Sequence, residues 1–315
     1  MGKFILKRLL MMIPVVLGVI IIVFTILRLS PNDPIRSVLG DMASEEEVQA
    51  MREEMGLNDP IPVQLFNYLK GIITKGDFGV SYVNRHEVTS EIGSRFPITV
   101  TLAITSTLLA GLLGIPLGII AAYKQYGLLD NVATVFSLIF LAMPEFWLAL
   151  MLIITFALNL GWFPPSGWYG VEYMVLPILA TGTGCIAGIM RTTRSNMLEV
   201  IRQDYIRTAR AKGLKERTII CKHALRNALI PVITLMGLQF GKMLGGVFVI
   251  ETIFAIPGLG KLLVDACSIK NIPIVQGGVI CIAVVYGLVN LAVDILYGFV
   301  DPRISSLYKK AKKEA

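Results

Sequence analysis

Six runs of apolar residues, each long enough to cross a lipid bilayer, constrain this chain more than any other feature of its sequence. The hydrocarbon core of a bilayer is about 30 Å thick, so a helix that crosses it needs roughly 20 predominantly apolar residues. Helices are the expected spanning elements, because hydrocarbon offers no partner to unpaired backbone groups. We therefore predict an all-α polytopic membrane protein with six transmembrane helices, at residues 9–29, 97–122, 131–158, 173–190, 229–253 and 275–299.

The composition agrees with a single membrane domain. Apolar residues make up 55% of the 315 residues and charged residues only 16%. Soluble domains contain roughly 45–50% apolar residues. We predict one transmembrane domain over residues 1–315, with an extracytoplasmic segment at about 31–96 and a cytoplasmic loop at about 191–228.

The 29 Lys and Arg residues fall mainly on one side of the predicted membrane. They gather at the N-terminus, in the 191–228 loop and from residue 303 onward, and loops rich in these residues stay in the cytoplasm. We therefore expect both termini to be cytoplasmic in a multi-pass protein of the cell (inner or plasma) membrane. This topology explains the net charge of +7 without a nucleic-acid partner. No small-residue cleavage site follows the first run, so we expect a retained anchor.

The residue types that commonly carry chemistry form no recognisable site. The four cysteines include no C-x-x-C pair, and the two histidines, His86 and His223, fall on opposite sides of the predicted membrane. We therefore expect no disulfide framework and no metal site. The runner-up class is an intramembrane enzyme, such as a protease or a lipid-modifying transferase. The sequence contains neither G-x-S-x-G nor H-E-x-x-H, so we expect no catalytic residue and no cofactor in this chain.

Two ionisable residues fall near the middle of predicted spans, Glu145 in the third and Lys242 in the fifth. Ionisable groups are costly in hydrocarbon and usually face a protein interior or a wet cavity. We therefore expect both of them, together with Gln239, to line a translocation path. The alternative is a structural ion pair between the two charges. Asp294 lies closer to the cytoplasmic boundary, where water has access, so we rank it lower.

Small residues recur at every fourth position in two of the predicted spans. Such stripes let helix backbones approach closely in lipid. Packing within the chain is the favoured interpretation, and pairing with a second chain is the alternative. The stripes are Ala110, Gly114, Gly118 and Ala122, and Gly237, Gly241 and Gly245.

The polar segment at 31–96 contains an acidic stretch, residues 45–54, with apolar residues beside it. This pattern predicts a short amphipathic helix at the external face. One interpretation of the whole segment is an extracytoplasmic cap or docking surface, and the other is a solvated connector.

The 191–228 loop is predicted to contain two short helices. Asn196 followed by Glu199 suits a capping box, and Gly213 suits a helix stop. One helix face would then fit a groove on a soluble partner, although topology alone also explains a basic loop. The residues that share this face by their spacing are Ile201, Tyr205, and Thr208 or Ala209.

The run DYIRTARAKGL at residues 204–214 resembles the signature loop of ABC-importer permeases. Ala209 and Gly213 match its alanine and the glycine four residues on, whereas Arg207 and Thr208 stand where that family has glutamate and alanine. The run HALRNALIP at 223–231 resembles the peptide and nickel branch of the family, which carries dipeptides and oligopeptides. Further runs that resemble this branch are DFGVSY (77–82), MPEFW (143–147), ETIFAIPGLG (251–260) and DPRI (301–304).

The resemblance implies a type I ABC-importer permease fold and a transport subunit that is not itself an enzyme. The implied partners are a second homologous permease, two ATPase subunits that bind ATP and Mg, an extracytoplasmic substrate-binding protein and membrane lipid. The implied cargo is di- or oligopeptides. Nickel or a glutathione-like solute is the alternative cargo, and an ATP-independent channel or carrier is a further alternative. By resemblance, the residues that couple to an ATPase are Ile201, Asp204, Tyr205, Thr208, Ala209, Ala211, Gly213 and Leu214.

Two glycine-containing runs approach the phosphate loop of nucleotide-binding proteins but do not match it. GLQFGKM at 237–243 and AIPGLGK at 255–261 both lack the final Ser or Thr of that loop. Hydrolysis of ATP is therefore expected in the partner subunits.

The segment after the fifth predicted span is expected at the external mouth of the membrane domain. Irregular backbone at membrane depth is allowed only where it is covered or lines a cavity. By resemblance this segment is a gate or rim, and a plain connecting turn is the alternative. Its candidate residues are Glu251, Pro257, Gly258 and Gly260.

Overall fold

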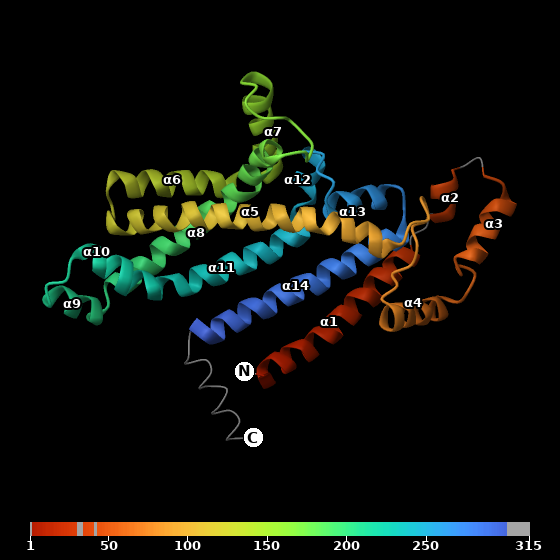
Figure 1. The fold of residues 1–315 in the computed structure, drawn as a ribbon, viewed down its shortest axis with the longest axis horizontal. Helices are drawn as coiled ribbons and strands as arrows, with labels where there is room; N and C mark the ends of the chain where they lie inside the picture. Colours follow the sequence, from red (N-terminus) through yellow and green to blue (C-terminus); the bar gives the residue numbers. More distant parts are fainter. Residues whose placement is uncertain (1, 30–33, 41–42, 301–315) are drawn as a thin grey trace.

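The computed structural model describes residues 2–29, 34–40 and 43–300, and these ranges form helices joined by loops, with one isolated antiparallel bridge between Val80 and Glu87. Figure 1 shows an elongated bundle of long helices. The elements are α1 (Gly2–Arg28), α2 (Pro34–Leu39), α3 (Glu45–Glu54), α4 (Ile61–Lys75), α5 (Val88–Tyr123), α6 (Leu128–Ala142), α7 (Glu145–Leu152), the π-helix η1 (Ile153–Asn159), α8 (Val171–Ile201), α9 (Asp204–Ala211), α10 (Glu216–Thr218), the π-helix η2 (Ile219–Ala224), α11 (Leu225–Gly246), α12 (Phe248–Ile253), α13 (Leu259–Ser268) and α14 (Ile272–Val300).

Five helices in the described part of the chain are long and apolar enough to cross a membrane. A bent pair, α6 followed by α7 and η1, passes the same test when its two halves are taken together. The predicted all-α membrane fold is confirmed, with six spans when the bent pair counts as one. The five others are Ile5–Arg28, Val88–Tyr123, Val171–Ile201, Glu216–Gly245 and Ile272–Leu296.

The bend in the third span lies at Met143 and Pro144. The sequence predicts one run over 131–158, but α6 ends at Ala142 and the chain turns by 103° before α7. A residue before proline is pushed out of the helical region by the proline ring. Met143 accordingly has extended backbone angles, and Pro144 is the N-cap of α7. As a result, α7 projects away from the long axis of the bundle (Figure 1).

The stripes of small residues pack against other helices of the same chain, as predicted. A Cβ added at Gly114 would lie 2.9 Å from the carbonyl oxygen of Ile186, and one at Gly118 would lie 2.6 Å from that of Met190, so α5 packs closely on α8. On α11, a Cβ at Gly241 would lie 3.2 Å from the ring of Tyr286 on α14. The backbones of these helix pairs approach as closely as the missing side chains allow.

The largest buried apolar cluster joins α5, α8, α11 and α12. Its fully buried members include Leu102, Leu176, Ile189, Val232 and Ile250. The side chains of this cluster fix the mutual position of α8 and α11.

Helices α2, α3 and α4 form a small layer at one end of the bundle (Figure 1). The predicted amphipathic helix is present as α3, and a capping box between Ser44 and Glu47 starts it. Val48 and Met51 are buried, whereas its glutamates face outward. This end is joined to α14 by Asn271, whose Oδ1 accepts the backbone N–H of Tyr82 at 3.1 Å.

The opposite end of the bundle carries α9, and here one sequence expectation was wrong. No helix begins at Asn196, because α8 continues to Ile201. The apolar face of α8 extends past this point through Met197, which is fully buried against the end of α5 and η2. Continuing a helix that still has a face to bury costs less than nucleating a new one.

Candidate functional site

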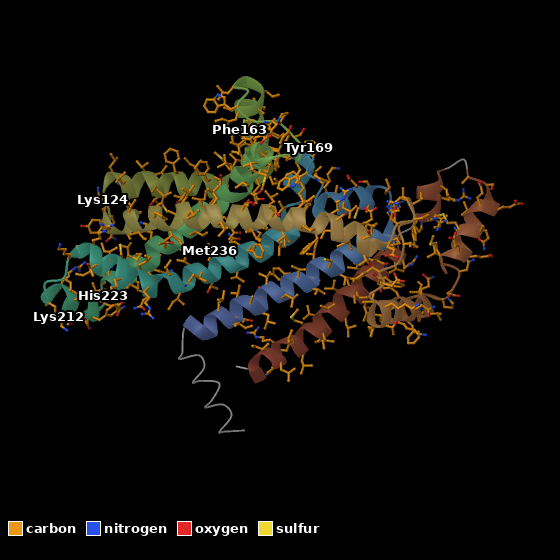
Figure 2. All side chains as sticks on the ribbon, viewed as in Figure 1. Lys124, Phe163, Tyr169, Lys212, His223 and Met236 are labelled. Atoms are coloured by element: carbon orange, nitrogen blue, oxygen red, sulfur yellow. The ribbon has the colours of Figure 1, made fainter. Side chains whose placement is uncertain are left out.

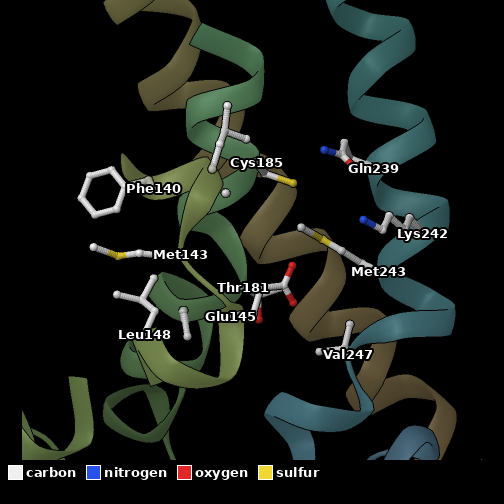
Figure 3. A pocket seen from close by; sticks show the side chains of 13 residues that line it. Phe140, Met143, Glu145, Leu148, Thr181, Cys185, Gln239, Lys242, Met243 and Val247 are labelled. Atoms are coloured by element: carbon white, nitrogen blue, oxygen red, sulfur yellow. The ribbon is translucent and has the colours of Figure 1, made fainter. Parts of the chain in front are cut away.

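A cavity of about 210 Å³ lies between α6, α7, α8 and α11 (Figure 3). It is lined by both apolar and polar side chains, and all three residues predicted to line a translocation path are among them. The lining residues are Phe140, Leu141, Met143, Glu145, Leu148, Ala180, Thr181, Gly184, Cys185, Gln239, Lys242, Met243 and Val247.

The bend before α7 places Glu145 at the cavity. Glu145 is the first residue of α7, directly after the N-cap Pro144. Gln239 and Lys242 lie three residues apart on α11, so they share one face of that helix. Figure 3 shows the polar ends of both side chains directed toward the cavity.

The two charges in the cavity are neighbours without being bonded. Glu145 and Lys242 line the same cavity from two different helices. However, no ion pair within 4.0 Å joins them in the part of the chain that the structure describes. The direct ion pair that the sequence left as the alternative is therefore not formed in this conformation.

Thr181 on α8 adds an unpaired hydroxyl to the cavity wall. Its side chain is 4% exposed, and its Oγ1 has no hydrogen-bond partner among the described residues. A Thr hydroxyl in a helix commonly bonds a carbonyl of the preceding turn, as Thr183 does to Leu179 at 2.5 Å. Thr181 therefore keeps an unpaired donor and acceptor buried in the wall of the cavity.

The predicted rim segment is built around the carboxylate of Glu251. This side chain is fully buried and accepts hydrogen bonds from Thr99 Oγ1 at 2.5 Å and from the backbone N–H of Lys261 at 2.8 Å. Lys261 lies in the first turn of α13, so the carboxylate satisfies backbone donors that a helix start leaves unpaired.

Steric limits explain the two glycines of this segment. A Cβ at Gly258 would overlap the carboxylate of Glu251, and one at Gly260 would lie 2.7 Å from Cα of Phe248. Pro257 precedes Gly258 in the connection between α12 and α13. The four predicted residues thus lie in one compact unit beside the cavity, since Val247 precedes α12 and also lines the cavity.

Helix α9 and the turn after it form the second candidate site, which we call the end helix (residues 204–214). Two of its residues, Ile206 and Ala209, are buried against η2 and the end of α8. Gly213 follows the helix with φ of 76°, the left-handed conformation that glycine adopts without strain. Of the residues expected to couple to an ATPase, those exposed on the end helix are Asp204, Tyr205, Thr208, Ala211, Gly213 and Leu214.

Two of the residues assigned to the coupling face do not lie on it. Ile201 ends α8, and Arg202 and Gln203 separate it from α9, so it shares no helix face with Tyr205. Ala209 faces the interior. The expectation placed Ile201 and Tyr205 on the same short helix, but α8 ends at Ile201 and α9 begins at Asp204.

The end helix is tied to the bundle by polar contacts as well. Arg210 and Glu216 form an ion pair at 2.6 Å, and Asn227 Nδ2 donates to the hydroxyl oxygen of Tyr205 at 2.8 Å. Figure 2 shows Lys124, Lys212 and His223 at this same end, which is the basic end of the bundle.

Sequence reasoning missed two ion pairs that join spans. Asp130 at the start of α6 is paired with Arg194 on α8 by contacts of 2.5 and 2.7 Å. Asp294, which we ranked below Glu145 and Lys242 as a path residue, is paired with Arg8 at 2.9 Å and joins α14 to α1. No spacing rule connects residues so far apart in sequence, although an aspartate in the first turn of a helix is a recognisable signal at position 130.

Two family models match most of the chain. Residues 114–306 match the model described as binding-protein-dependent transport system inner membrane component. Residues 1–103 match the model for the N-terminal part of such membrane components.

Curated proteins are similar to this chain over nearly its full length. The chain is 42% identical to the oligopeptide transport system permease protein AppB of Bacillus subtilis, over 96% of this chain and 99% of that protein. It is 39% identical to the dipeptide transport system permease protein DppB of Alkalihalophilus pseudofirmus, with 95% and 98% covered. It is 41% identical to the glutathione transport system permease protein GsiC of Salmonella choleraesuis, with 96% and 99% covered.

Solved structures share the fold at lower identity. The inward-facing MetNI methionine ABC transporter matches with a TM-score of 0.56 and 18% identity, over 68% of this chain and 97% of that chain. An amino acid ABC transporter crystallised with histidines matches with a TM-score of 0.50 and 16% identity, over 68% and 94%. The arrangement of helices is therefore that of ABC-importer permeases.

Proposed function

This chain belongs to the family of binding-protein-dependent transport system inner membrane components, and on that basis we propose that it forms the translocation path for di- and oligopeptides in an ATP-driven importer. The observation that carries the proposal is the polar cavity between α6, α7, α8 and α11 in a fold that ABC-importer permeases share. The relatives that transport oligopeptides and dipeptides by name are about 40% identical to it, and this likeness supports the choice of cargo.

The chain acts as a transport subunit, and ATP hydrolysis takes place in two partner ATPase subunits that bind ATP and Mg. The end helix is the docking element for one of them. Its residues Tyr205 and Leu214 are exposed, and Lys212, which follows α9, lies at the basic end of the bundle (Figure 2). The small layer of α2–α4 at the opposite end then faces the extracytoplasmic binding protein, and both termini are cytoplasmic.

A second homologous permease closes the open side of the cavity. The helices beside the cavity carry large apolar side chains that the described residues leave exposed. The exposed residues of this kind on α6 and α7 include Leu138, Leu141, Phe146, Trp147 and Leu150. The second permease and membrane lipid share this surface.

Packing contacts support a route from the docking element to the cavity. The end helix packs on η2 and the last turns of α8 through Ile206 and Ala209. Helix α8 also carries Thr181, and α11, which continues from η2, carries Lys242. A displacement of the end helix by closure of the ATPases therefore moves two walls of the cavity as packed units, which is how access alternates between the two sides.

A glutathione-like cargo is the second candidate. Glutathione permeases of Salmonella are 40–41% identical to this chain, which is as close as the dipeptide relative. Nickel complexes are a third cargo class, for which the cavity supplies no His side chain.

Reconstitution tests this proposal. The permease, its partner permease and the two ATPases are placed in proteoliposomes, and uptake of labelled trialanine, glutathione and nickel is measured with the binding protein present. We expect uptake of trialanine that requires ATP. Uptake that continues without ATP or without the ATPases would identify a channel or carrier instead.

A further inference from the structure

We propose that the cavity binds the two charged ends of a short zwitterionic peptide, with Glu145 receiving the N-terminal ammonium and Lys242 the C-terminal carboxylate. This inference rests on the proposed function and adds the chemistry by which the membrane path itself recognises its cargo.

The first argument is the cost of the two charges. An ionisable side chain at membrane depth is expensive and normally has a partner. Glu145 and Lys242 line one cavity, yet no ion pair or hydrogen bond to described residues engages the side chain of either one. A ligand that brings one ammonium and one carboxylate supplies the missing partner of each. Charge-assisted hydrogen bonds of this kind are among the stronger polar contacts in proteins.

The second argument is the unpaired hydroxyl of Thr181. A buried polar group without a partner is costly, and it is seldom retained without a reason. Thr181 Oγ1 is such a group, and it lies in the wall of the same cavity. Gln239 contributes an amide with both donors and an acceptor one turn from Lys242. The Gln239 amide matches the N–H and C=O groups of a peptide backbone, and the Thr181 hydroxyl gives the wall behind it a further unpaired polar group.

The third argument is size. Pockets that enclose drug-sized ligands typically measure about 300–1,000 Å³. The cavity of about 210 Å³ is smaller, so this chain accommodates a peptide backbone and not large side chains. The side chains of the cargo then lie toward the open side, where the second permease contributes its own wall. Such a division fits a transporter that accepts many sequences and requires only free peptide ends.

The fourth argument is charge balance. One positive and one negative side chain attract a neutral zwitterion while each repels a ligand that carries only its own sign. Amines without a carboxylate and carboxylates without an amine each leave one cavity charge unpaired, and are therefore disfavoured.

The experiment measures binding without the binding protein, so that only the membrane path is tested. The complex of both permeases and both ATPases is placed in nanodiscs, and its affinity for trialanine, N-acetyl-trialanine and trialanine amide is measured by NMR titration. For the wild-type complex, we expect each blocked peptide to bind about tenfold more weakly than trialanine, because one charged hydrogen bond is lost. Wild-type binding that is equal for free and blocked peptides overturns the assignment.

Two variants locate the contacts. With Glu145→Gln, trialanine should bind as weakly as the N-acetylated peptide, while sensitivity to the C-terminal amide is kept. With Lys242→Gln, the pattern should be reversed. A variant that weakens all three peptides equally overturns the assignment of that residue to a peptide end.

Matched controls and a second readout complete the design. Glu172→Gln on α8 and Lys75→Gln on α4 remove exposed charges outside the cavity and should change no affinity. Melting temperatures of all variant complexes identify any that are misfolded.

ATP-driven uptake of trialanine by the wild-type complex separates the zwitterion site from the proposed function. If trialanine binds in an end-dependent way but is not taken up, the proposed function is overturned and the zwitterion site stands. If trialanine is taken up but no binding is detected, the zwitterion site is overturned and the proposed function stands.

Discussion

The hydroxyl of Thr99 on α5 donates a hydrogen bond of 2.5 Å to the fully buried carboxylate of Glu251 on α12. The same oxygen accepts the backbone N–H of Leu259 at 2.8 Å, so one side chain joins α5 to both α12 and α13. Negative groups are stabilised at helix N-termini by the unpaired N–H groups there. Because the site is buried, these contacts are stronger than they would be in water, and losing one leaves a buried group unpaired.

Replacing Thr99 with Val should therefore destabilise the protein. The change removes the donor to Glu251 and the acceptor for Leu259, at an expected cost of about 1–3 kcal/mol in the free energy of unfolding. Thr99→Ser keeps the hydroxyl and should restore most of the loss. Thr101→Val is the matched control, since Thr101 is exposed and donates only to Pro97 of its own helix. Thermal melts in detergent measure the difference, and equal effects at the two positions would contradict the role given to Thr99.

Gly258→Ala should disrupt the segment between α12 and α13. The added Cβ would overlap the Glu251 carboxylate, which hydrogen bonds from Thr99 and Lys261 hold in place. We expect overpacking of this kind to cost about 1–3 kcal/mol and to reduce the yield of monodisperse protein.

Gly93→Ala is the control for that change. Gly93 lies in α5, where an added Cβ meets nothing within 4 Å, and alanine is the better helix former. This variant should melt at or slightly above the wild-type temperature. A Gly258→Ala variant that behaves like Gly93→Ala would show that the segment repacks freely.

The ion pair between Asp130 and Arg194 should stabilise the third span on the fourth. Asp130→Asn leaves the guanidinium of Arg194 without its charge partner. The Arg194 side chain is only 25% exposed. We expect a loss of about 2 kcal/mol, less than for a fully buried pair because water still reaches Arg194.

A double-mutant cycle with Arg194→Gln isolates this pair. If the contact is formed, the double variant should lose less stability than the sum of the two single variants. Asp204→Asn is the matched control, because Asp204 pairs with Arg207 at 4.0 Å and both side chains are largely exposed. Exposed pairs of this kind contribute little, so its melting temperature should not change. Strict additivity at Asp130 and Arg194 would contradict the pair.

Local signals in the sequence predicted much of this molecule. Apolar length located the six spans, and Gly213 was identified as a helix stop from one residue type. Spacing alone placed Glu145 and Lys242 at similar depth, and the structure brings both to one cavity.

The remaining features depend on contacts between distant residues. Asn196 and Glu199 have the spacing of a capping box, which predicts the start of a helix. However, α8 continues past them to Ile201, because Met197 is buried on its apolar face. The 103° bend at Pro144 could not be predicted from the proline alone, because α5, α8 and α11 continue through Pro116, Pro177 and Pro231. Gly258 and Gly260 are required because a Cβ at either position would collide with the buried Glu251 carboxylate. The sequence does not reveal this, since no periodicity relates these positions to Thr99, which holds that carboxylate.

Gly213→Leu should uncouple transport from ATP hydrolysis. Gly213 has φ of 76°, and a non-glycine residue in that conformation costs roughly 1–2 kcal/mol, so the turn after α9 would change shape. No atom lies within 4 Å of an added Cβ, so strain and not a clash is the cause. We expect trialanine uptake in proteoliposomes to fall while the melting temperature changes little. Gly213→Asn is the control, because asparagine tolerates the left-handed conformation, and it should retain uptake. Normal uptake and normal ATPase binding in Gly213→Leu would remove the end helix from the coupling route.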